Sequence, residues 1–291
     1  MSRTLSKPLP ERAAPEAAPL AEGRPALSAP RAERIARVLA PLAIGLLALA
    51  LWEAVVRVNH IPHYILPGPL LVLKSLIADW GTLWPSLLIT LQITFMALAV
   101  ATIGGVGLAI LFTTSRWIEL SFFPFAVILQ VTPIIAIAPL ILIYVDNTYI
   151  ALLICAWIVA FFPILANTTL GLNSADHNLI DLFQLYGASR WQTLLHLRLP
   201  AAMPYFLGGL KIGGGLSLIG AIVAEFAAGT AGTGSGLAYR ILEAGYRLNI
   251  PRMFAAVLLI SLTGVLIFMA FTLLAHLILR RWHESAVRRE R

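Results

Sequence analysis

Residues 176–225 read DHNLIDLFQLYGASRWQTLLHLRLPAAMPYFLGGLKIGGGLSLIGAIVAE, and they join two different kinds of sequence. The first half is polar enough to lie in water, whereas the second half has the apolar length of a membrane helix. Pro200 and Pro204 stand between them. Each lacks an N–H group and restricts the residue before it, so we expect the helix to break there. The sequence therefore predicts a short helical hairpin, over about residues 178–197, held at one face of a membrane.

The composition of the whole chain agrees with a membrane protein. Of its 291 residues, 59% are hydrophobic and 12% are charged, whereas soluble domains carry roughly 25% charged residues. The net charge is +7, but the arginines do not gather with exposed aromatic residues. We therefore interpret the charge as membrane topology and contact with anionic lipid, and expect no nucleic-acid partner. Cys155 is the single cysteine, so no disulfide can form within the chain.

Six apolar segments are long enough for a bilayer crossing, which takes about 20 residues, so we predict an all-α polytopic membrane protein. The predicted spans are about residues 38–56, 86–113, 121–145, 149–172, 203–228 and 254–279. Pro124, Pro133 and Pro139 interrupt the third span. A short amphipathic helix over about residues 70–80 is expected before the second span, and a glycine-rich loop over about residues 229–252 before the last.

The remaining segments set the domain boundaries and the orientation. Residues 1–34 are rich in Ala, Pro and Arg, so we expect a disordered tail there, a membrane domain over residues 35–282 and a basic tail over residues 283–291. Six spans place both termini on one side of the membrane. That side carries 15 Lys and Arg residues, including Arg190 and Arg198 of the hairpin, against five on the other side. The positive-inside rule therefore predicts that the termini and the hairpin are cytoplasmic.

No catalytic set is recognisable in the sequence. The chain has no Gly-Lys dipeptide, so it carries no Walker A phosphate loop, and no HExxH or GxSxG motif occurs. His60 and His63 have no third ligand nearby, so we expect no metal site. An integral-membrane enzyme stays as an alternative, because its residues could converge in space.

The hairpin carries a pattern with a known counterpart. From Asp181 the chain reads Asp-Leu-Phe-Gln-Leu-Tyr-Gly-Ala-Ser, and Gly187 is followed after nine residues by Leu197-x-Leu199-Pro200. This resembles the EAA loop of ABC importer permeases, which reads EAA, three residues, Gly, nine residues and Ile-x-Leu-Pro. Four positions differ from that loop: Asp181 replaces Glu, Leu182 and Phe183 replace two alanines, and Leu197 replaces Ile.

The resemblance covers about residues 60–280 and is similar to the nitrate, sulfonate and taurine type of permease, with Leu-Pro-Gly-Pro over residues 66–69. It implies the permease subunit of a type I ABC importer in a bacterial inner membrane, acting as a homodimer by alternating access. The implied partners are cytoplasmic ATPase subunits, which hydrolyse ATP, and an extracytoplasmic binding protein; the chain itself would bind no cofactor. The implied solute is a sulfonate, taurine, nitrate or a heterocycle such as a pyrimidine vitamin precursor. A secondary carrier is the alternative, but it would usually need an internal repeat, which the spans do not display.

The residues of the hairpin agree with this interpretation. Gly187 allows a sharp turn between two short helices. Leu182, Phe183, Leu185 and Tyr186 form an apolar face at helical spacing, which would be exposed unless it docks. This face could enter a groove on a partner or pack on the chain's own helix ends. The resemblance implies that the ATPase-coupling residues are Asp181, Leu182, Phe183, Tyr186, Gly187, Ala188, Leu197, Leu199 and Pro200.

Two ionisable residues, Lys211 and Glu225, lie within the fifth predicted span. They are 14 residues apart, which places them on one helix face but about 21 Å from each other, too far to pair. Charges inside a membrane are costly, so both are candidates for the solute pathway. Lys211 could instead anchor the helix at the interface, and Glu225 could order an outer loop or a gate. Gln130 and Thr132, beside the proline-broken backbone of the third span, are further pathway candidates.

Overall fold

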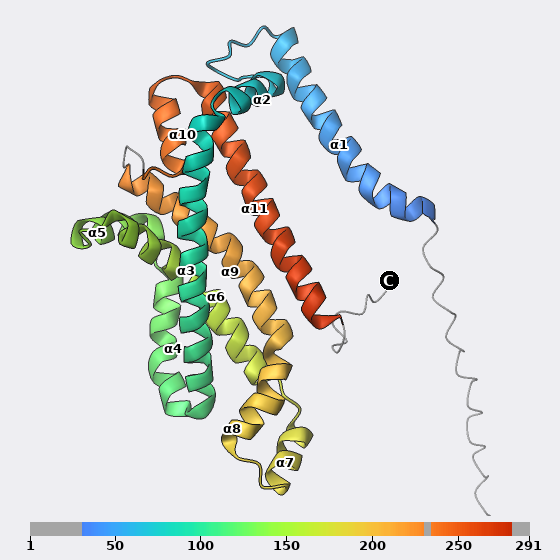
Figure 1. The fold of residues 1–291 in the computed structure, drawn as a ribbon, viewed down its shortest axis with the longest axis vertical. Helices are drawn as coiled ribbons and strands as arrows, with labels where there is room; N and C mark the ends of the chain where they lie inside the picture. The colour runs from blue at the N-terminus through green and yellow to red at the C-terminus, as the bar shows by residue number, and fades with distance from the viewer. Residues whose placement is uncertain (1–30, 230–233, 281–291) are drawn as a thin grey trace, which may run out of the picture. The chain divides into compact units, whose positions relative to one another are not determined.

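The computed structural model describes residues 31–229 and 234–280, with side chains from residue 39 onward. Its described part is helical and contains no strand (Figure 1). In chain order the elements are α1 (Arg31–Val58), α2 (Pro69–Ala78), α3 (Trp80–Thr114), α4 (Arg116–Val131), α5 (Ile134–Tyr144), α6 (Thr148–Leu172), α7 (His177–Leu185), α8 (Arg190–Thr193), η1 (Leu194–Arg198), α9 (Leu199–Ala228), α10 (Leu237–Tyr246) and α11 (Ile250–Leu279). Most of the two predicted tails lies outside the described residues, and α1 begins at Arg31.

The membrane spans largely follow the predicted ones. Within the described ranges, α1, α3, α6, α11 and the continuous segment Arg190–Ala228 are each long and apolar enough to cross a membrane. The third predicted span is the pair α4 and α5, which meet at an angle of 101°. Thr132 has an extended backbone there, as expected of a residue before a proline, and Pro133 begins the new direction. The described residues therefore contain up to six segments long and apolar enough to cross a membrane, when this bent pair is counted as one.

The break expected at Pro200 and Pro204 is wrong. Helix α8 continues through the π-turn η1 into α9, and both prolines lie within this helical segment. In the π-turn the N–H of Leu199 donates to the carbonyl of Leu194, five residues earlier. Such a turn shifts the hydrogen-bond register just before Pro200, which has no N–H to donate. The hairpin is thus joined to the membrane helix by a continuous backbone helix.

Helices α3, α6 and α9 form the centre of the unit that begins at Leu47; the first part of α1 belongs to another unit. Glycines bring α6 and α9 together. A Cβ at Gly209 would lie 2.9 Å from the Pro163 carbonyl oxygen, and a Cβ at Gly220 would lie 2.8 Å from the Cα of Ala156. Close backbone approach of this kind is how membrane helices gain packing energy without a hydrophobic driving force.

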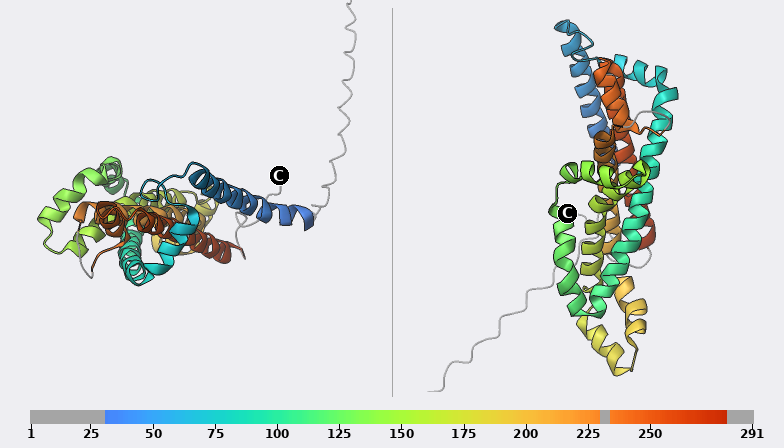
Figure 2. Two further views of the ribbon diagram at one scale, coloured as in Figure 1. Left: turned by 90° about the horizontal axis from the view of Figure 1, so that it is seen from above. Right: turned by 90° about the vertical axis from the view of Figure 1, so that its left-hand side faces the viewer.

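The segment Arg190–Ala228 connects two opposite ends of this unit. Figure 1 shows α7 and α8 projecting at one end, and α2, α10 and the start of α11 gathered at the other. The right-hand view of Figure 2, turned about the vertical axis, shows the same separation. The two ends are therefore joined by one continuous helical segment.

Candidate functional site

The turn of the hairpin is built by a glycine in the left-handed region. Gly187 has a φ of +69°, and its N–H donates to the Gln184 carbonyl at 2.9 Å. The N–H of Ala188 reaches the Phe183 carbonyl, also at 2.9 Å. These two bonds form a Schellman motif, which closes the last turn of α7. The sharp turn predicted at Gly187 is therefore present.

Both short helices of the hairpin begin with side-chain caps. The Asp176 carboxylate accepts from the N–H of Asn178 at 2.9 Å at the start of α7. Ser189 and Gln192 form a reciprocal capping box at the start of α8. Because the polar groups at these helix starts have partners, the hairpin can hold its shape at the membrane surface.

The apolar face of α7 is left open. Leu185 and Tyr186 are 83% and 82% exposed, and Leu182 is 45% exposed, while Phe183 is half-buried. None of the residues of α7 is buried. The whole face therefore does not pack on the chain's own helix ends, which was one of the two alternatives.

The second half of the predicted coupling motif is anchored instead. Leu197, Leu199 and Pro200 are half-buried where the hairpin enters α9, and Leu199 packs against the core. Leu194, one helical turn earlier, is a buried member of that same core cluster. The motif thus has an exposed half, which includes Asp181, and a half that is packed into the membrane bundle.

At the opposite end of α9, Glu225 is 2% exposed and is held by the chain itself. Its carboxylate accepts from the Thr90 hydroxyl at 2.7 Å and from the Ala238 N–H at 2.9 Å. The Leu237 N–H donates to the same Thr90 oxygen at 2.9 Å. Glu225 and Thr90 therefore cap the first turn of α10 from two other helices, and a Cβ at Gly236 would collide with the Glu225 carboxylate.

Lys211 and Glu225 contact different elements. The ammonium of Lys211 lies 4.0 Å from the ring centroid of Phe268 on α11, a cation–π contact. In the described part of the chain, neither residue forms an ion pair with an acidic or basic side chain. The prediction that the two cannot pair directly agrees with this arrangement.

Gln130 and Thr132 lie at the bend between α4 and α5. Gln130 is exposed, and the Thr132 hydroxyl donates to the Ile128 carbonyl at 2.6 Å, so its proton is used within its own helix. The structure therefore separates the four pathway candidates: Gln130 and Thr132 lie at the bend, while Lys211 and Glu225 lie on α9, against Phe268 of α11 and the first turn of α10 respectively.

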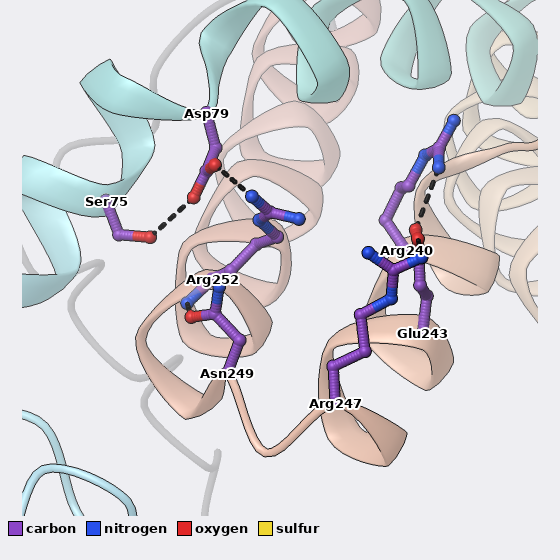
Figure 3. A network of polar contacts seen from close by, with 7 residues as sticks. All are labelled: Ser75, Asp79, Arg240, Glu243, Arg247, Asn249 and Arg252. Carbon is purple, nitrogen blue, oxygen red and sulfur yellow. Dashed lines mark hydrogen bonds and ion pairs between the residues drawn. The ribbon is translucent and has the colours of Figure 1, made fainter.

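Polar contacts gather along α10 and at the start of α11 (Figure 3). Asp79, just before α3, forms an ion pair with Arg252 and accepts from the Ser75 hydroxyl at 2.9 Å. The Asn249 side chain accepts from the Arg252 N–H and caps α11. Asp79 and Arg252 are not among the site residues expected from the sequence, because both lie outside the predicted spans.

A second part of this network lies on α10. Glu243 pairs with Arg240 at 2.8 Å and with the exposed Arg247 at 2.9 Å, and the Arg240 Nε donates to the Ser86 hydroxyl at 2.9 Å. The hydrogen bond from Arg240 lowers the pKa of Glu243, and the one from Arg252 lowers the pKa of Asp79. Both carboxylates thus favour their charged form. The end of the unit that lies opposite the hairpin, with α2, α10 and the start of α11, is called the outer end.

Helix α10 itself was predicted as a loop, because glycines dominate the start of the segment. The spacing of Arg240, Glu243 and Arg247, three and four residues apart, is a helical signal that could have revealed it. Similarly, Ser86, Thr90 and Thr94 recur every four residues in an apolar span and are all buried. That stripe indicates a polar contact inside a membrane bundle.

The sequence also matches known proteins. Residues 101–284 match the family of binding-protein-dependent transport system inner membrane components. A riboflavin transport system permease of Chloroflexus aurantiacus is 31% identical, over 82% of this chain and 88% of its own length. A formylaminopyrimidine transport permease of Halalkalibacterium halodurans is 30% identical, over 80% and 92%. The taurine transport system permease of Escherichia coli is 28% identical, over 75% and 81%.

The fold has a counterpart among solved structures. A chain in the crystal structure of an amino acid ABC transporter with histidines superimposes with a TM-score of 0.58 at 18% identity. The match covers 72% of this chain and 97% of that one. At this identity the likeness concerns the arrangement of helices, and it covers most of the membrane part described above.

Proposed function

Because the chain belongs to the family of binding-protein-dependent transport system inner membrane components, it is a permease subunit of an ABC importer and not an enzyme, and we propose that two copies form the solute path. It acts with an ATPase subunit and a substrate-binding protein. We further propose that the ATPase alone binds and hydrolyses ATP, so this chain needs no cofactor. In the proposed cycle, ATPase closure moves the hairpins, the membrane helices swing, and the path opens to alternate sides.

One observation carries the coupling role: the hairpin presents Leu182, Leu185 and Tyr186 to the exterior on a well-capped scaffold. A short amphipathic helix with exposed anchors fits a groove on another protein. The continuous helix from Arg190 to Ala228 then links that groove to the membrane bundle. The exposed half of the motif is proposed to touch the ATPase, while Leu197, Leu199 and Pro200 transmit its movement.

The face of α9 that remains open supports the homodimer. Tyr205, Ile212, Ile219 and Phe226 recur every seven residues and are all exposed. Gly208 and Gly215 lie between them and have open space where a Cβ would be. Heptad spacing with small residues is typical of a seam between two membrane helices. We propose that α9 of a second copy covers this seam.

We propose a small organic solute, with a flat nitrogen heterocycle preferred over sulfonate, taurine or nitrate. The two relatives at 30% identity or more that are named above carry names for riboflavin and formylaminopyrimidine transport. In α9, Lys211 lies against an aromatic ring and Glu225 is occupied by backbone and hydroxyl donors. Lys211, Gln130 and Thr132 stay proposals for the pathway, and for Glu225 the contacts support the loop-ordering alternative.

The proposed location is a bacterial inner membrane, with both termini and the hairpin in the cytoplasm. The charge count supports this orientation, since the hairpin side carries the larger share of Lys and Arg. The multi-pass character itself follows from the family and from the apolar helices.

The deciding experiment is purification of the tagged chain from native membranes in mild detergent, with mass determination of the complex and ATP-driven uptake in vesicles. We expect two copies of this chain with two ATPase subunits. Gly187→Arg should lose the ATPase and the uptake, because Arg strains the left-handed turn and projects from an open surface. Gly187→Asn is the matched control, since Asn tolerates that conformation.

Intact ATP-driven uptake by Gly187→Arg would contradict the coupling role of the hairpin. A single copy of the chain in the purified complex would contradict the homodimer while leaving the coupling role in place.

A further inference from the structure

A cavity of about 530 Å³ lies between the end of α3 and the hairpin. Arg190 and Arg198 line it from the hairpin side, together with Gln184 and Trp191, and Thr113 and Thr114 line it from α3. No Asp or Glu is among the residues that line it. The cavity therefore has a positive wall without a compensating carboxylate.

The two arginines have no acidic partner in the described part of the chain. Arg198 is half-buried, so its guanidinium has lost part of its water. Guanidinium groups bind phosphate through two parallel N–H donors, and they form stronger hydrogen bonds to anions than to neutral acceptors. An anion with several oxygen acceptors would therefore complement the positive charge of this wall.

The remaining polar groups narrow the chemistry. The hydroxyls of Thr113 and Thr114 donate to the carbonyls of Ile110 and Leu111 at 2.8 and 2.7 Å. Their protons are thus used within α3, and the Thr193 hydroxyl likewise donates to the Ser189 carbonyl. The donors left for a ligand are the arginines, the Gln184 amide and the Trp191 indole N–H. This set suits a phosphate group better than a neutral sugar or a cation.

The depth of the cavity points to a lipid. Thr114 is the last residue of the span Trp80–Thr114, and Arg198 directly precedes α9, so both mark the end of the apolar helices. Trp191 is exposed beside the cavity, as aromatic residues often are at the level of lipid headgroups. Basic pockets between membrane helices at that level bind anionic headgroups.

We propose that this cavity binds the phosphate of an anionic phospholipid and that the lipid ties the hairpin to the end of α3. The phosphate oxygens of the bound headgroup accept hydrogen bonds from Arg190 and Arg198, and the acyl chains follow the apolar surface of the helices. The hairpin is then held at a defined distance from the bundle before any partner docks. This inference stands on the cavity and does not rest on the proposed function.

The test uses the purified full-length chain after removal of lipid, with native mass spectrometry and thermal midpoints as readouts. Phosphatidylglycerol, cardiolipin, phosphatidylcholine and inorganic phosphate are added separately. We expect retention of the two anionic lipids, a rise in the thermal midpoint, and no comparable effect of the other two. Arg190→Ala/Arg198→Ala should weaken anionic-lipid binding by about thirtyfold, the effect of two basic residues at a membrane surface.

Two control variants separate charge from folding. Arg190→Lys/Arg198→Lys keeps both charges and should keep most of the preference for anionic over zwitterionic lipid. Arg280→Ala removes one exposed charge beyond α11, outside the cavity lining, and should leave lipid binding unchanged. If the alanine variant fails to fold, the wild-type chain and the lysine variant still decide the question through that preference.

Equal binding of anionic lipid by the wild-type chain and the alanine variant would overturn the proposal, as would equal retention of phosphatidylcholine. Displacement of the lipid by inorganic phosphate at equal concentration would assign the site to a soluble phosphate compound instead. An alanine variant that loses the ATPase but keeps the lipid would assign both arginines to the protein partner.

Discussion

The two ends of the segment Arg190–Ala228 differ in what surrounds their side chains. At the hairpin end, polar groups are capped locally, but Leu185 and Tyr186 have no apolar cover. At the outer end, the carboxyl group of Glu225 is buried and accepts hydrogen bonds from α3 and α10 of the same chain. The buried carboxyl group at one end therefore finds its partners within this chain, while the apolar face of the hairpin at the other end is left uncovered.

This difference suggests how one helix can serve two purposes. The outer end is a set of buried polar contacts, which tolerate little displacement because an unpaired buried group is costly. The hairpin end is rigid within itself and open toward the exterior. We therefore expect a movement of the hairpin to be transmitted along α9 to the contacts between Glu225 and the first turn of α10. These contacts then either move with α9 or break.

The largest expected effect is at the hairpin end. Leu185→Ser/Tyr186→Ser should weaken binding of the ATPase by at least about a hundredfold, because buried aromatic anchors commonly contribute 2 kcal/mol or more each. The fold of the chain itself should be unaffected, since both side chains are exposed. The measurement is ATPase affinity for the purified chain in detergent, with the thermal midpoint as a check of folding.

A matched pair exists at the outer end. Tyr246 and Leu248 are 87% and 72% exposed, so Tyr246→Ser/Leu248→Ser removes the same two residue types from the end opposite the hairpin. We expect unchanged ATPase affinity in this variant. If it lost the ATPase as strongly as the hairpin variant, the two ends would not differ in the way that their exposed residues suggest.

The second effect is at the buried end. Glu225→Ala leaves the buried Ala238 N–H without its acceptor, which costs about 1–3 kcal/mol, while the Thr90 hydroxyl can still donate to the Ser86 carbonyl at 3.2 Å. We expect a clear fall in the thermal midpoint and faster hydrogen exchange of the backbone N–H groups of Leu237 and Ala238. ATPase affinity should stay within about twofold of the wild-type value, because no hairpin residue is altered.

Glu225→Gln refines this expectation, since its carbonyl oxygen can still accept one of the two bonds. It should fall between the wild-type chain and Glu225→Ala in thermal midpoint. An alanine variant with normal stability and protected amides but lost uptake would instead favour contact between Glu225 and the solute.

Much of the hairpin end could be predicted from the sequence, because its signals are local. Gly187 marks the turn, and the spacing from Leu182 to Tyr186 marks the exposed face. The expected break at Pro200 was wrong, because a π-turn over Leu194–Arg198 accommodates the missing N–H, and proline alone does not reveal that turn.

The outer end could be predicted only in part, because its contacts join residues far apart in the chain. Glu225 was recognised as unusual from its place in an apolar span, but its partner Thr90 lies 135 residues away. Likewise, Asp79 and Arg252 come from different elements, separated by 173 residues. A single sequence identifies the costly charge, while the three-dimensional packing of α3, α9, α10 and α11 decides what satisfies it.

The smallest expected effect concerns the Asp79–Arg252 pair, which tests whether the outer end acts as one fastened unit. The hydrogen bond from Arg252 lowers the pKa of Asp79 below its ordinary value of 3.8, and the Ser75 hydroxyl adds to it. A lowered pKa in the folded state means that the pair stabilises the fold fully above about pH 4 and that this stabilisation is lost as the pH falls through the lowered pKa. Asp79→Asn should therefore cost about 1–2 kcal/mol at neutral pH and flatten the acid decline of the thermal midpoint.

Arg247→Ala, which removes the exposed partner of Glu243, should change stability by less than about 0.5 kcal/mol and keep the acid decline. An unchanged acid decline in Asp79→Asn would mean that Asp79 is not held by Arg252 in solution, and the outer end would then be fastened by Glu225 and the α10 pairs alone.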